Sequence, residues 1–208
     1  MLIAGAKGHA VEVIDVLLQQ YSGEQLVLFD NVSESFELET VKRFSIVRNE
    51  SETLSLFKSD NRFVLGIGNP YIRKKLADYL ISLGGELHSA ISSRAVVSSC
   101  NVSLGKGINV MHGAIIQPEV TIGDGALINA AALIHHESKI GQYCEICPGT
   151  IITGNVTIGD FTLIGSGAVI LPGIKIGAHV KVGAGAVVVK NVEDNVTVAG
   201  NPARRLIK

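Results

Sequence analysis

Apolar and polar positions follow a strict six-residue period over residues 104–193. Every sixth residue from Leu104 to Val188 is Leu, Ile or Val, without an insertion over fifteen hexads, and the residue four positions further on is small or branched. This period fits neither the 3.6-residue repeat of an α-helix nor the two-residue alternation of a hairpin strand. It predicts a parallel β-helix in which three hexads form one triangular coil, and residues 18 apart stack about 4.8 Å from each other.

The first 84 residues instead show short apolar runs between helical patterns. Residues 1–5 read as an apolar strand, and residues 10–20 place Val13, Ile14, Leu17 and Leu18 on one helical face. The same reasoning predicts further strands at 26–29 and 62–67, an edge strand near 43–47, and helices near 52–57 and 71–83. This alternation predicts a small Rossmann-like α/β domain with a parallel sheet of three or four strands.

The change of pattern predicts the domain organisation. Between the two patterns, Ile91 and Val97 are already six residues apart before the period slips by one residue to Leu104, as in an imperfect capping coil. We therefore expect an N-terminal domain at 1–84, a linker and capping coil at 85–103, the β-helix at 104–193 and a C-terminal tail at 194–208.

Composition narrows the functional classes. The 208 residues include 18 Lys and Arg against 19 Asp and Glu, so no basic excess favours nucleic acid as a partner. The most apolar stretch, residues 182–189, is far shorter than the ~20 residues that span a bilayer, and the N-terminus lacks a signal-peptide pattern. We therefore expect a cytoplasmic protein without membrane insertion.

The turn after the first strand carries a candidate nucleotide site. Gly5-Ala6-Lys7-Gly8-His9-Ala10 lies between a strand and a helix, where backbone N–H groups can bind phosphate. Asp30 ends the next strand, near the ~20-residue spacing at which an acid reaches a ribose hydroxyl in dinucleotide folds. Gly66-Ile67-Gly68-Asn69 ends the third strand at the same sheet edge. Because a second mononucleotide half is missing, one nucleotide with a sugar fits better than NAD; tight packing of the glycines is the alternative.

A second group of polar residues lies outside the core positions of the hexads. Asn129, His136 and Glu137 belong to it, and an exposed imidazole beside a carboxylate is typical of a general base. Gly154 follows His136 by 18 residues, so it lies one coil further, where its N–H could stabilise an oxyanion. A solvated polar turn is the alternative interpretation.

Metal or redox chemistry has weak support in the sequence. Cys144 and Cys147 have a CxxC spacing, but Cys144 occupies an inward position and Cys147 a corner, so the two thiols are not expected to meet. The total of three cysteines is odd, and we expect reduced thiols. The six histidines show no stacking at multiples of 18 along the hexads, so we expect no metal. A zinc carbonic anhydrase remains an alternative that elemental analysis would decide.

Together these motifs resemble the sugar O-acyltransferase family. The family includes sialic acid O-acetyltransferases and nucleotide-4-amino-sugar N-acetyltransferases, and the chain looks most like the enzymes that make UDP-diacetylbacillosamine. The resemblance covers nearly the whole chain and rests on the N-terminal turn, Gly66-Ile67-Gly68-Asn69, Ile72-Arg73-Lys74-Lys75, Asn129, His136-Glu137, Gly154-Asn155-Val156 and Ala199-Gly200-Asn201-Pro202-Ala203-Arg204. It implies a left-handed β-helix, a homotrimer with active sites between protomers, and acetyl transfer from acetyl-CoA to the C4 amine of a UDP-linked 4-amino-4,6-dideoxy sugar.

The resemblance also implies residue roles. His136 would be the general base, with Glu137 raising its basicity. The UDP-amino sugar would contact Lys7, Gly8, His9, Asp30, Asn31 and Gly68, and acetyl-CoA would contact Asn129, Glu145, Gly154, Ser166 and Ala184. The chain differs from a well-known relative at two of these positions. Glu145 stands where the relative has a second histidine near the thioester, and Asn31 stands where it has a second aspartate.

Two other functions share these motifs. A sialic acid O-acetyltransferase would use the same base, although Asp30 favours a nucleotide-linked sugar. A noncatalytic nucleotide-sugar-binding scaffold would keep the N-terminal turn and the trimer but would tolerate the loss of His136.

Overall fold

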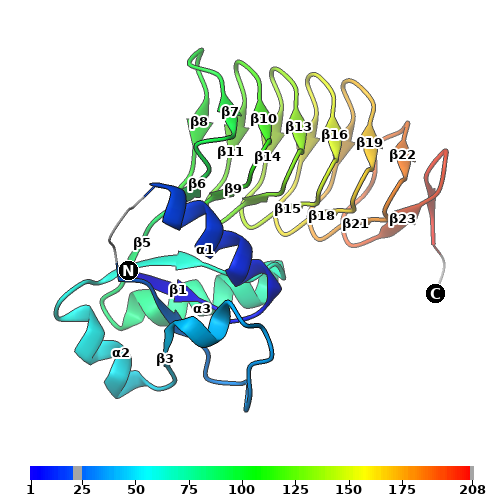
Figure 1. The fold of residues 1–208 in the computed structure, drawn as a ribbon. Helices are drawn as coiled ribbons and strands as arrows, with labels where there is room; N and C mark the ends of the chain where they lie inside the picture. Colours follow the sequence, from blue (N-terminus) through cyan, green and yellow to red (C-terminus); the bar gives the residue numbers. More distant parts are fainter. Residues whose placement is uncertain (21–24, 207–208) are drawn as a thin grey trace.

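An α/β unit packs against the first coils of a long triangular prism, and the C-terminal coils lie at the far end (Figure 1). The computed structural model describes residues 1–20 and 25–206. Residues 21–24 of the expected N-terminal domain and residues 207–208 of the expected tail lie outside the described residues.

The N-terminal unit alternates strands and helices around one parallel sheet. Its elements are β1 (Leu2–Ala4), α1 (Gly8–Gln20), β2 (Val27–Phe29), the 3₁₀ turn η1 (Val41–Arg43), β3 (Ser45–Val47), α2 (Glu50–Phe57), β4 (Arg62–Leu65), α3 (Pro70–Ser82) and β5 (Glu86–Leu87). The strand order is β3-β2-β1-β4-β5. Helix α1 packs on the face that carries Ile3, Leu28 and Val64, and α3 packs on the opposite face. The carboxyl ends of β1, β2 and β4 therefore meet at one edge, where open α/β sheets bind ligands.

The sheet has five strands, so the expectation of three or four was wrong. The additional strand is β5, in which Glu86 pairs with Arg62 and Leu87 with Phe63. It extends the sheet beyond residue 84. Two residues are too few to show an alternating pattern, so the free edge of β4, and not the local sequence, determines this strand.

Helix α3 carries a charged residue on its buried face. Asn69 caps the helix through its side-chain oxygen, which accepts the N–H groups of Tyr71 and Ile72, and Pro70 occupies the first turn. The buried stripe then consists of Arg73, Ala77 and Leu80.

The prism has three faces of stacked strands, all parallel to their neighbours except the last strand of the longest face. We name them by their central strands: the β13 face comprises β7 (Val96–Val97), β10 (Ile115–Ile116), β13 (Leu133–Ile134), β16 (Ile151–Ile152), β19 (Val169–Ile170) and β22 (Val187–Val188). The β14 face comprises β8 (Ser103–Leu104), β11 (Thr121–Ile122), β14 (Lys139–Ile140), β17 (Thr157–Ile158) and β20 (Lys175–Ile176). The β15 face comprises β6 (Ala90–Ile91), β9 (Asn109–Val110), β12 (Leu127–Ile128), β15 (Glu145–Ile146), β18 (Leu163–Ile164), β21 (Lys181–Val182), β23 (Thr197–Ala199) and β24 (Arg204–Arg205).

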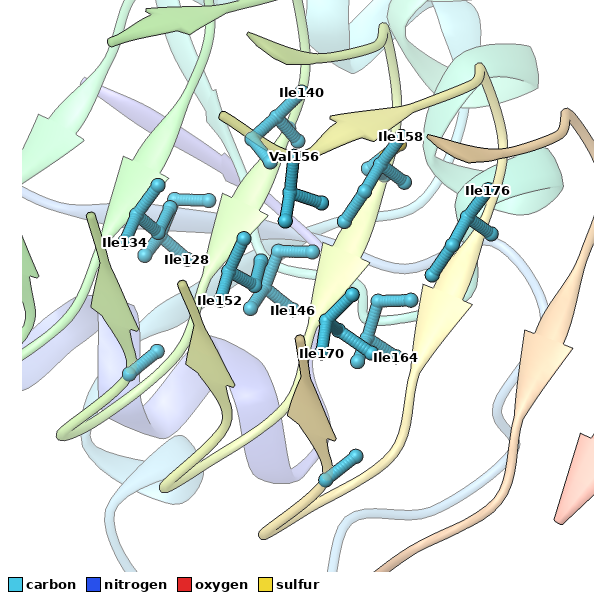
Figure 2. Packing of buried hydrophobic residues seen from close by; sticks show 14 of the residues in the cluster. Ile128, Ile134, Ile140, Ile146, Ile152, Val156, Ile158, Ile164, Ile170 and Ile176 are labelled. Carbon is cyan, nitrogen blue, oxygen red and sulfur yellow. The ribbon is translucent and has the colours of Figure 1, made fainter. Parts of the chain in front are cut away.

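The register confirms the stacking of residues 18 apart. Ile134 pairs with Ile152 on the next coil, and the aliphatic residues point into the prism (Figure 2). Ile91 pairs with Val110, a step of 19, which accommodates the slip before Leu104. Strands β23 and β24 belong to the β15 face, so part of the expected tail continues the prism; their pairing escaped the sequence because the hexad period ends before them.

The N-terminal unit covers the β15 face through a buried guanidinium. Arg73 is 1% exposed, and its Nε donates to the carbonyl of Gly125 at 2.7 Å. One Nη donates to the carbonyls of Tyr143 at 3.1 Å and Cys144 at 2.8 Å. At the other side of this interface, the His112 ring lies 2.7 Å from the Asp15 carboxylate of α1. These contacts fix the position of the sheet edge relative to the prism.

Candidate active site

A cavity of about 550 Å³ opens at the carboxyl ends of β1, β2 and β4. This volume lies within the usual range for small-molecule sites. Five of the six residues expected to contact a nucleotide sugar line the cavity, namely Lys7, His9, Asp30, Asn31 and Gly68. Gly8 begins α1, and a Cβ added there would have no atom within 4 Å. The structure therefore brings the expected nucleotide-sugar residues together, with Gly8 beside rather than in the lining.

Close approach of the backbones requires two of the lining glycines. A Cβ on Gly5, whose φ is +132°, would lie 2.7 Å from the carbonyl oxygen of Gly66. A Cβ on Gly66 would lie 2.9 Å from the Ile3 side chain and 3.1 Å from the Ala10 backbone. Tight packing and a ligand-accessible backbone therefore coexist at this edge.

Asp30 shapes the rim of the cavity. Its Oδ1 accepts the N–H groups of Val32 at 2.9 Å and Ser33 at 2.8 Å, and its Oδ2 accepts the Ser33 hydroxyl at 2.8 Å. Burial alone would raise the pKa of this carboxyl, but the hydrogen bonds from Ser33 and Val32 outweigh it, so the pKa is lowered. Asp30 is thus an ionised acceptor that already orders the loop after β2.

His9 is held in one tautomer. Its Nδ1 lies 2.8 Å from Glu12 Oε2, and its Nε2 lies 3.2 Å from Asn109 Nδ2. Because Asn109 Nδ2 is a donor and Glu12 is an acceptor, Nδ1 carries the proton and Nε2 offers its lone pair. Asn109 also donates to the Leu65 carbonyl, so it connects the prism to the end of β4.

Glu145 lies where the cavity meets the prism. It projects outward from β15, and its Oε1 is 3.2 Å from the position of a Cβ built on Gly68. Burial raises the pKa of this carboxyl, while the positive charge of Arg73 only partly opposes the effect. Glu145 was expected on the acetyl-CoA side; the structure places its carboxylate against a residue that lines the nucleotide-sugar cavity.

His136 and Glu137 form a hydrogen-bonded pair, the candidate acid–base pair, on the turn from the β13 face to the β14 face. His136 Nδ1 lies 2.9 Å from Glu137 Oε2, and both side chains are more than half exposed. The imidazole packs on Gly154, since a Cβ there would lie 2.7 Å from His136 Cε1. Among the described residues, no acceptor bonds the N–H of Gly154. At the equivalent turn positions, Gln142 and Lys106 donate their N–H groups to an aspartate of the next coil.

The remaining acetyl-CoA candidates lie on a different edge of the prism. Ser166 and Ala184 occupy the turns from the β15 face to the β13 face, and the carbonyl of Ser166 accepts the N–H of Gly185 in the next coil at 2.9 Å. Asn129 lies at the same edge two coils earlier, 9% exposed, with its Oδ1 accepting the Ala130 N–H. One chain therefore presents Asn129, Ser166 and Ala184 on one edge and His136 with Gly154 on another.

The nucleotide-sugar cavity and His136 are also separated within one chain. The cavity lies over the β15 face, where Arg73 of α3 binds the Gly125 carbonyl of the prism and Asn109 of β9 binds the Leu65 carbonyl of the N-terminal unit. His136 occupies the opposite edge, where the β13 and β14 faces meet. No single chain brings the cavity, the acid–base pair and the Ser166 edge to one place.

The cysteines occupy the positions expected from the hexads. Cys144 is buried in the prism core, and burial raises its thiol pKa to about 12. Cys147 lies at a corner, half-buried, and burial raises its thiol pKa to about 11. Within residues 1–20 and 25–206, no three His, Cys, Asp or Glu side chains gather in a metal-binding group. No helix in this part of the chain is long and apolar enough to cross a membrane.

Known families and solved structures match both parts of the chain. Residues 1–80 match the PglD N-terminal domain, and residues 155–190 match the bacterial transferase hexapeptide repeat. PerB from Caulobacter crescentus, solved with CoA and GDP-perosamine, is 33% identical over 99% of this chain and 96% of its own, with a TM-score of 0.89. The acetyltransferase domain of PglB from Neisseria gonorrhoeae, solved with acetyl coenzyme A, is 30% identical over 99% of this chain and 98% of its own (TM-score 0.88). WeeI from Acinetobacter baumannii is 29% identical, with the same coverage and TM-score. No curated protein sequence matches the chain.

The near-complete coverage of PerB at 33% identity decides the family. The chain belongs to the PglD family of sugar N-acetyltransferases. This confirms the resemblance inferred from the motifs, and the prism is the left-handed β-helix that the hexapeptide repeat forms. The family assignment favours N-acetylation over the O-acetylation and scaffold alternatives.

Sequence reasoning missed two residues that build the site of this PglD-family chain. Arg73 belongs to one of the motifs, but the sequence analysis gives it no role. The helical spacing places it in one stripe with Ala77 and Leu80, and a cation on an apolar helix face indicates buried hydrogen-bond partners. Asn109 occupies an outward hexad position, where a polar residue is ordinary. Only the docking of the N-terminal unit on β9 shows its function.

Proposed function

We propose that this protein transfers the acetyl group of acetyl-CoA to the C4 amine of a UDP-linked 4-amino-4,6-dideoxy sugar. Membership in the PglD family supports N-acetylation, and the cavity at the sheet edge supports a nucleotide-linked acceptor. PerB binds CoA and GDP-perosamine, which are the same two classes of ligand. The observation that carries the proposal is the His136–Glu137 pair packed on Gly154, whose N–H is free to bind a developing oxyanion.

The N-terminal unit would bind the acceptor. Lys7 and the backbone at the start of α1 suit the diphosphate, because N–H groups and a cation gather there. Asn31, exposed at the rim, offers an amide that can pair with a base such as uracil. Since Asp30 is engaged by its own loop, it would act mainly by holding that rim in place.

The acid–base pair accounts for the chemistry. With Nδ1–H donating to Glu137, His136 Nε2 has a free lone pair and accepts a proton from the attacking amine. A nitrogen–carbon bond forms to the thioester carbonyl, and the negative charge on its oxygen faces the Gly154 N–H. The carbon–sulfur bond then breaks, and the imidazolium returns the proton to the thiolate of CoA. The amine is the nucleophile, so no enzyme nucleophile is needed.

A neighbouring copy would complete each site. The cavity, the His136 edge and the Ser166 edge are separate in one chain, so a homotrimer of parallel prisms would bring the edge of one copy to the cavity of another. In such a cleft, acetyl-CoA would contact Asn129, Gly154, Ser166 and Ala184. We place the reaction in the cytoplasm, where both co-substrates are made.

Thiol release tests the proposal. The protein would be incubated with acetyl-CoA and, separately, with UDP-, GDP- and dTDP-linked 4-amino-4,6-dideoxy sugars and free sialic acid. We expect CoA release with a UDP-amino sugar and an acetamide in the product by mass spectrometry. Release only with a GDP- or dTDP-linked sugar would change the nucleotide, release only with sialic acid would indicate O-acetylation, and no release would favour a binding scaffold.

A further inference from the structure

Glu145 is a partly buried acid beside the cavity. Its side chain is half-buried at the boundary between β15 and the N-terminal unit, and its carboxylate faces Gly68. Among the described residues, no group donates a hydrogen bond or forms an ion pair with this carboxylate. Removal of a carboxylate from water without a partner is unfavourable, so a partly buried, unpaired acid beside a cavity indicates a ligand.

The polar side chains nearest to Glu145 are committed to other partners. The Arg73 guanidinium donates to five backbone carbonyls, those of Ile67, Gly68, Gly125, Tyr143 and Cys144. His9 directs its Nδ1–H to Glu12 and its Nε2 to Asn109. The Arg73 charge contributes a favourable field at Glu145, but neither side chain contacts the Glu145 carboxylate.

Glu145 also differs from the other acid at the cavity. Asp30 already accepts three hydrogen bonds from its own loop, at 2.8 to 2.9 Å. Glu145 is therefore the carboxylate with acceptor positions left for a ligand, and it lies at the Gly68 side, where the cavity meets the prism.

From this geometry we infer that Glu145 binds the ammonium form of the acceptor's amino group and selects amino sugars over the corresponding hydroxy sugars. The inference rests on the proposed function and names the feature of the acceptor that is recognised. An aliphatic amine is largely protonated near neutral pH, and a carboxylate prefers an ammonium to a hydroxyl because the contact is charge-assisted. The amino sugar and the hydroxy sugar carry the same nucleotide and the same diphosphate at Lys7. Only the amino group would therefore distinguish the two ligands.

Binding measurements with paired ligands test this role. Dissociation constants would be measured by calorimetry at pH 6.5 for the UDP-4-amino sugar and its 4-hydroxy counterpart, with wild type, Glu145→Gln, Glu145→Asp and Glu86→Gln. Glu86→Gln is the matched control, because Glu86 is an exposed acid on β5 away from the cavity. We expect wild type and Glu86→Gln to prefer the amino sugar about ten- to a hundredfold, and Glu145→Gln to lose that preference while its affinity for the hydroxy sugar stays unchanged. Glu145→Asp should keep part of it.

Turnover separates this inference from the proposed function. The bound ammonium must release one proton to solvent before its nitrogen can attack, and His136 accepts the second proton as the nitrogen–carbon bond forms. In Glu145→Gln, KM for the amino sugar should rise while kcat stays within about threefold of wild type, because His136 still accepts that second proton. Equal weakening of both sugars would instead assign Glu145 a structural role and overturn the inference. If wild type acetylates the amino sugar and Glu145→Gln keeps its preference, only the inference fails. If wild type binds neither nucleotide sugar, the proposed function fails with it.

Discussion

The imidazole of His136 packs directly on the Cα of Gly154, one coil further along the prism. A Cβ on Gly154 would lie 2.7 Å from His136 Cε1 and 2.9 Å from Nε2. Gly154 has no positive φ that would itself require glycine. The glycine is therefore needed to leave space for the imidazole, and it leaves a free N–H next to the ring.

Replacement of Gly154 by alanine should displace the proposed base without unfolding the prism. The added methyl group would push the ring away by several tenths of an ångström, and misplacement of this order costs up to about a hundredfold in rate. We expect kcat to fall ten- to a hundredfold and the melting temperature to stay within about 2 °C. Gly113→Asn is the control, since Gly113 occupies a left-handed turn position (φ +71°) that asparagine tolerates. An unchanged kcat in Gly154→Ala would remove the proposed importance of this contact.

His136→Ala should separate chemistry from acceptor binding. Loss of a general base lowers kcat by about 10²- to 10⁴-fold. The nucleotide and the diphosphate bind to the N-terminal unit in the proposed complex, so the dissociation constant of the UDP-amino sugar should change less than threefold. Stopped-flow thiol release and calorimetry on the same preparation measure both quantities. A kcat near wild type would show that the proton leaves by another route.

The period of the sequence predicts the prism and the position of the His136 edge, because the spacing of residues along the chain determines which of them stack. The aliphatic hexads predicted that Ile134 stacks on Ile152, and the same step of 18 placed Gly154 beside His136. The docking of the N-terminal unit was beyond such reasoning. The contacts of Arg73 with Tyr143, like those of Glu145 with Gly68, join segments about 70 residues apart that no periodicity relates. They depend on how two independently patterned units fit together.

Arg73→Met should loosen this docking. The substitution removes the donors of five carbonyl groups, several of them buried, and an unsatisfied buried polar group costs about 1–3 kcal/mol. Because some of these carbonyls have other donors, such as the Leu127 N–H at Cys144, we expect a total loss of about 3–5 kcal/mol in urea unfolding. KM for the nucleotide sugar should rise as well. Lys74→Met, at a more exposed neighbour paired with Asp78, should cost less than about 1 kcal/mol; equal losses in the two variants would contradict the role of Arg73.

The difference in unfolding free energy between wild type and Glu145→Gln should depend on pH. Burial raises the pKa of Glu145 in the folded protein, so the folded state binds its proton more tightly than the unfolded state does. The stability that the protonated carboxyl contributes is fully present below its ordinary pKa of 4.5. It is lost as the pH rises through the raised pKa of Glu145 in the folded protein. At pH 7 the ionised carboxylate therefore destabilises the free enzyme, and Glu145→Gln should unfold at a higher urea concentration than wild type. The difference should shrink toward pH 4. A variant less stable than wild type at pH 7 would show that its attraction to Arg73 outweighs burial.

Mixed oligomers test whether neighbouring copies share each site. Lys7→Glu should disable the cavity by repelling the diphosphate, and His136→Ala should disable the base, while neither change touches the prism core. If the base of one copy serves the cavity of another, co-expressed and doubly affinity-purified oligomers of the two variants contain some sites with both parts intact. In a trimeric ring that contains both variants, one of the three sites takes an intact cavity from one copy and an intact base from its neighbour, so double purification leaves about a third of the wild-type sites. We therefore expect kcat per chain near a third of wild type, although each variant alone is nearly inactive. If each chain contained a complete site, the mixed oligomers would have no more activity than the average of the two variants, and the separation of His136 from the cavity would then require a large movement within one chain.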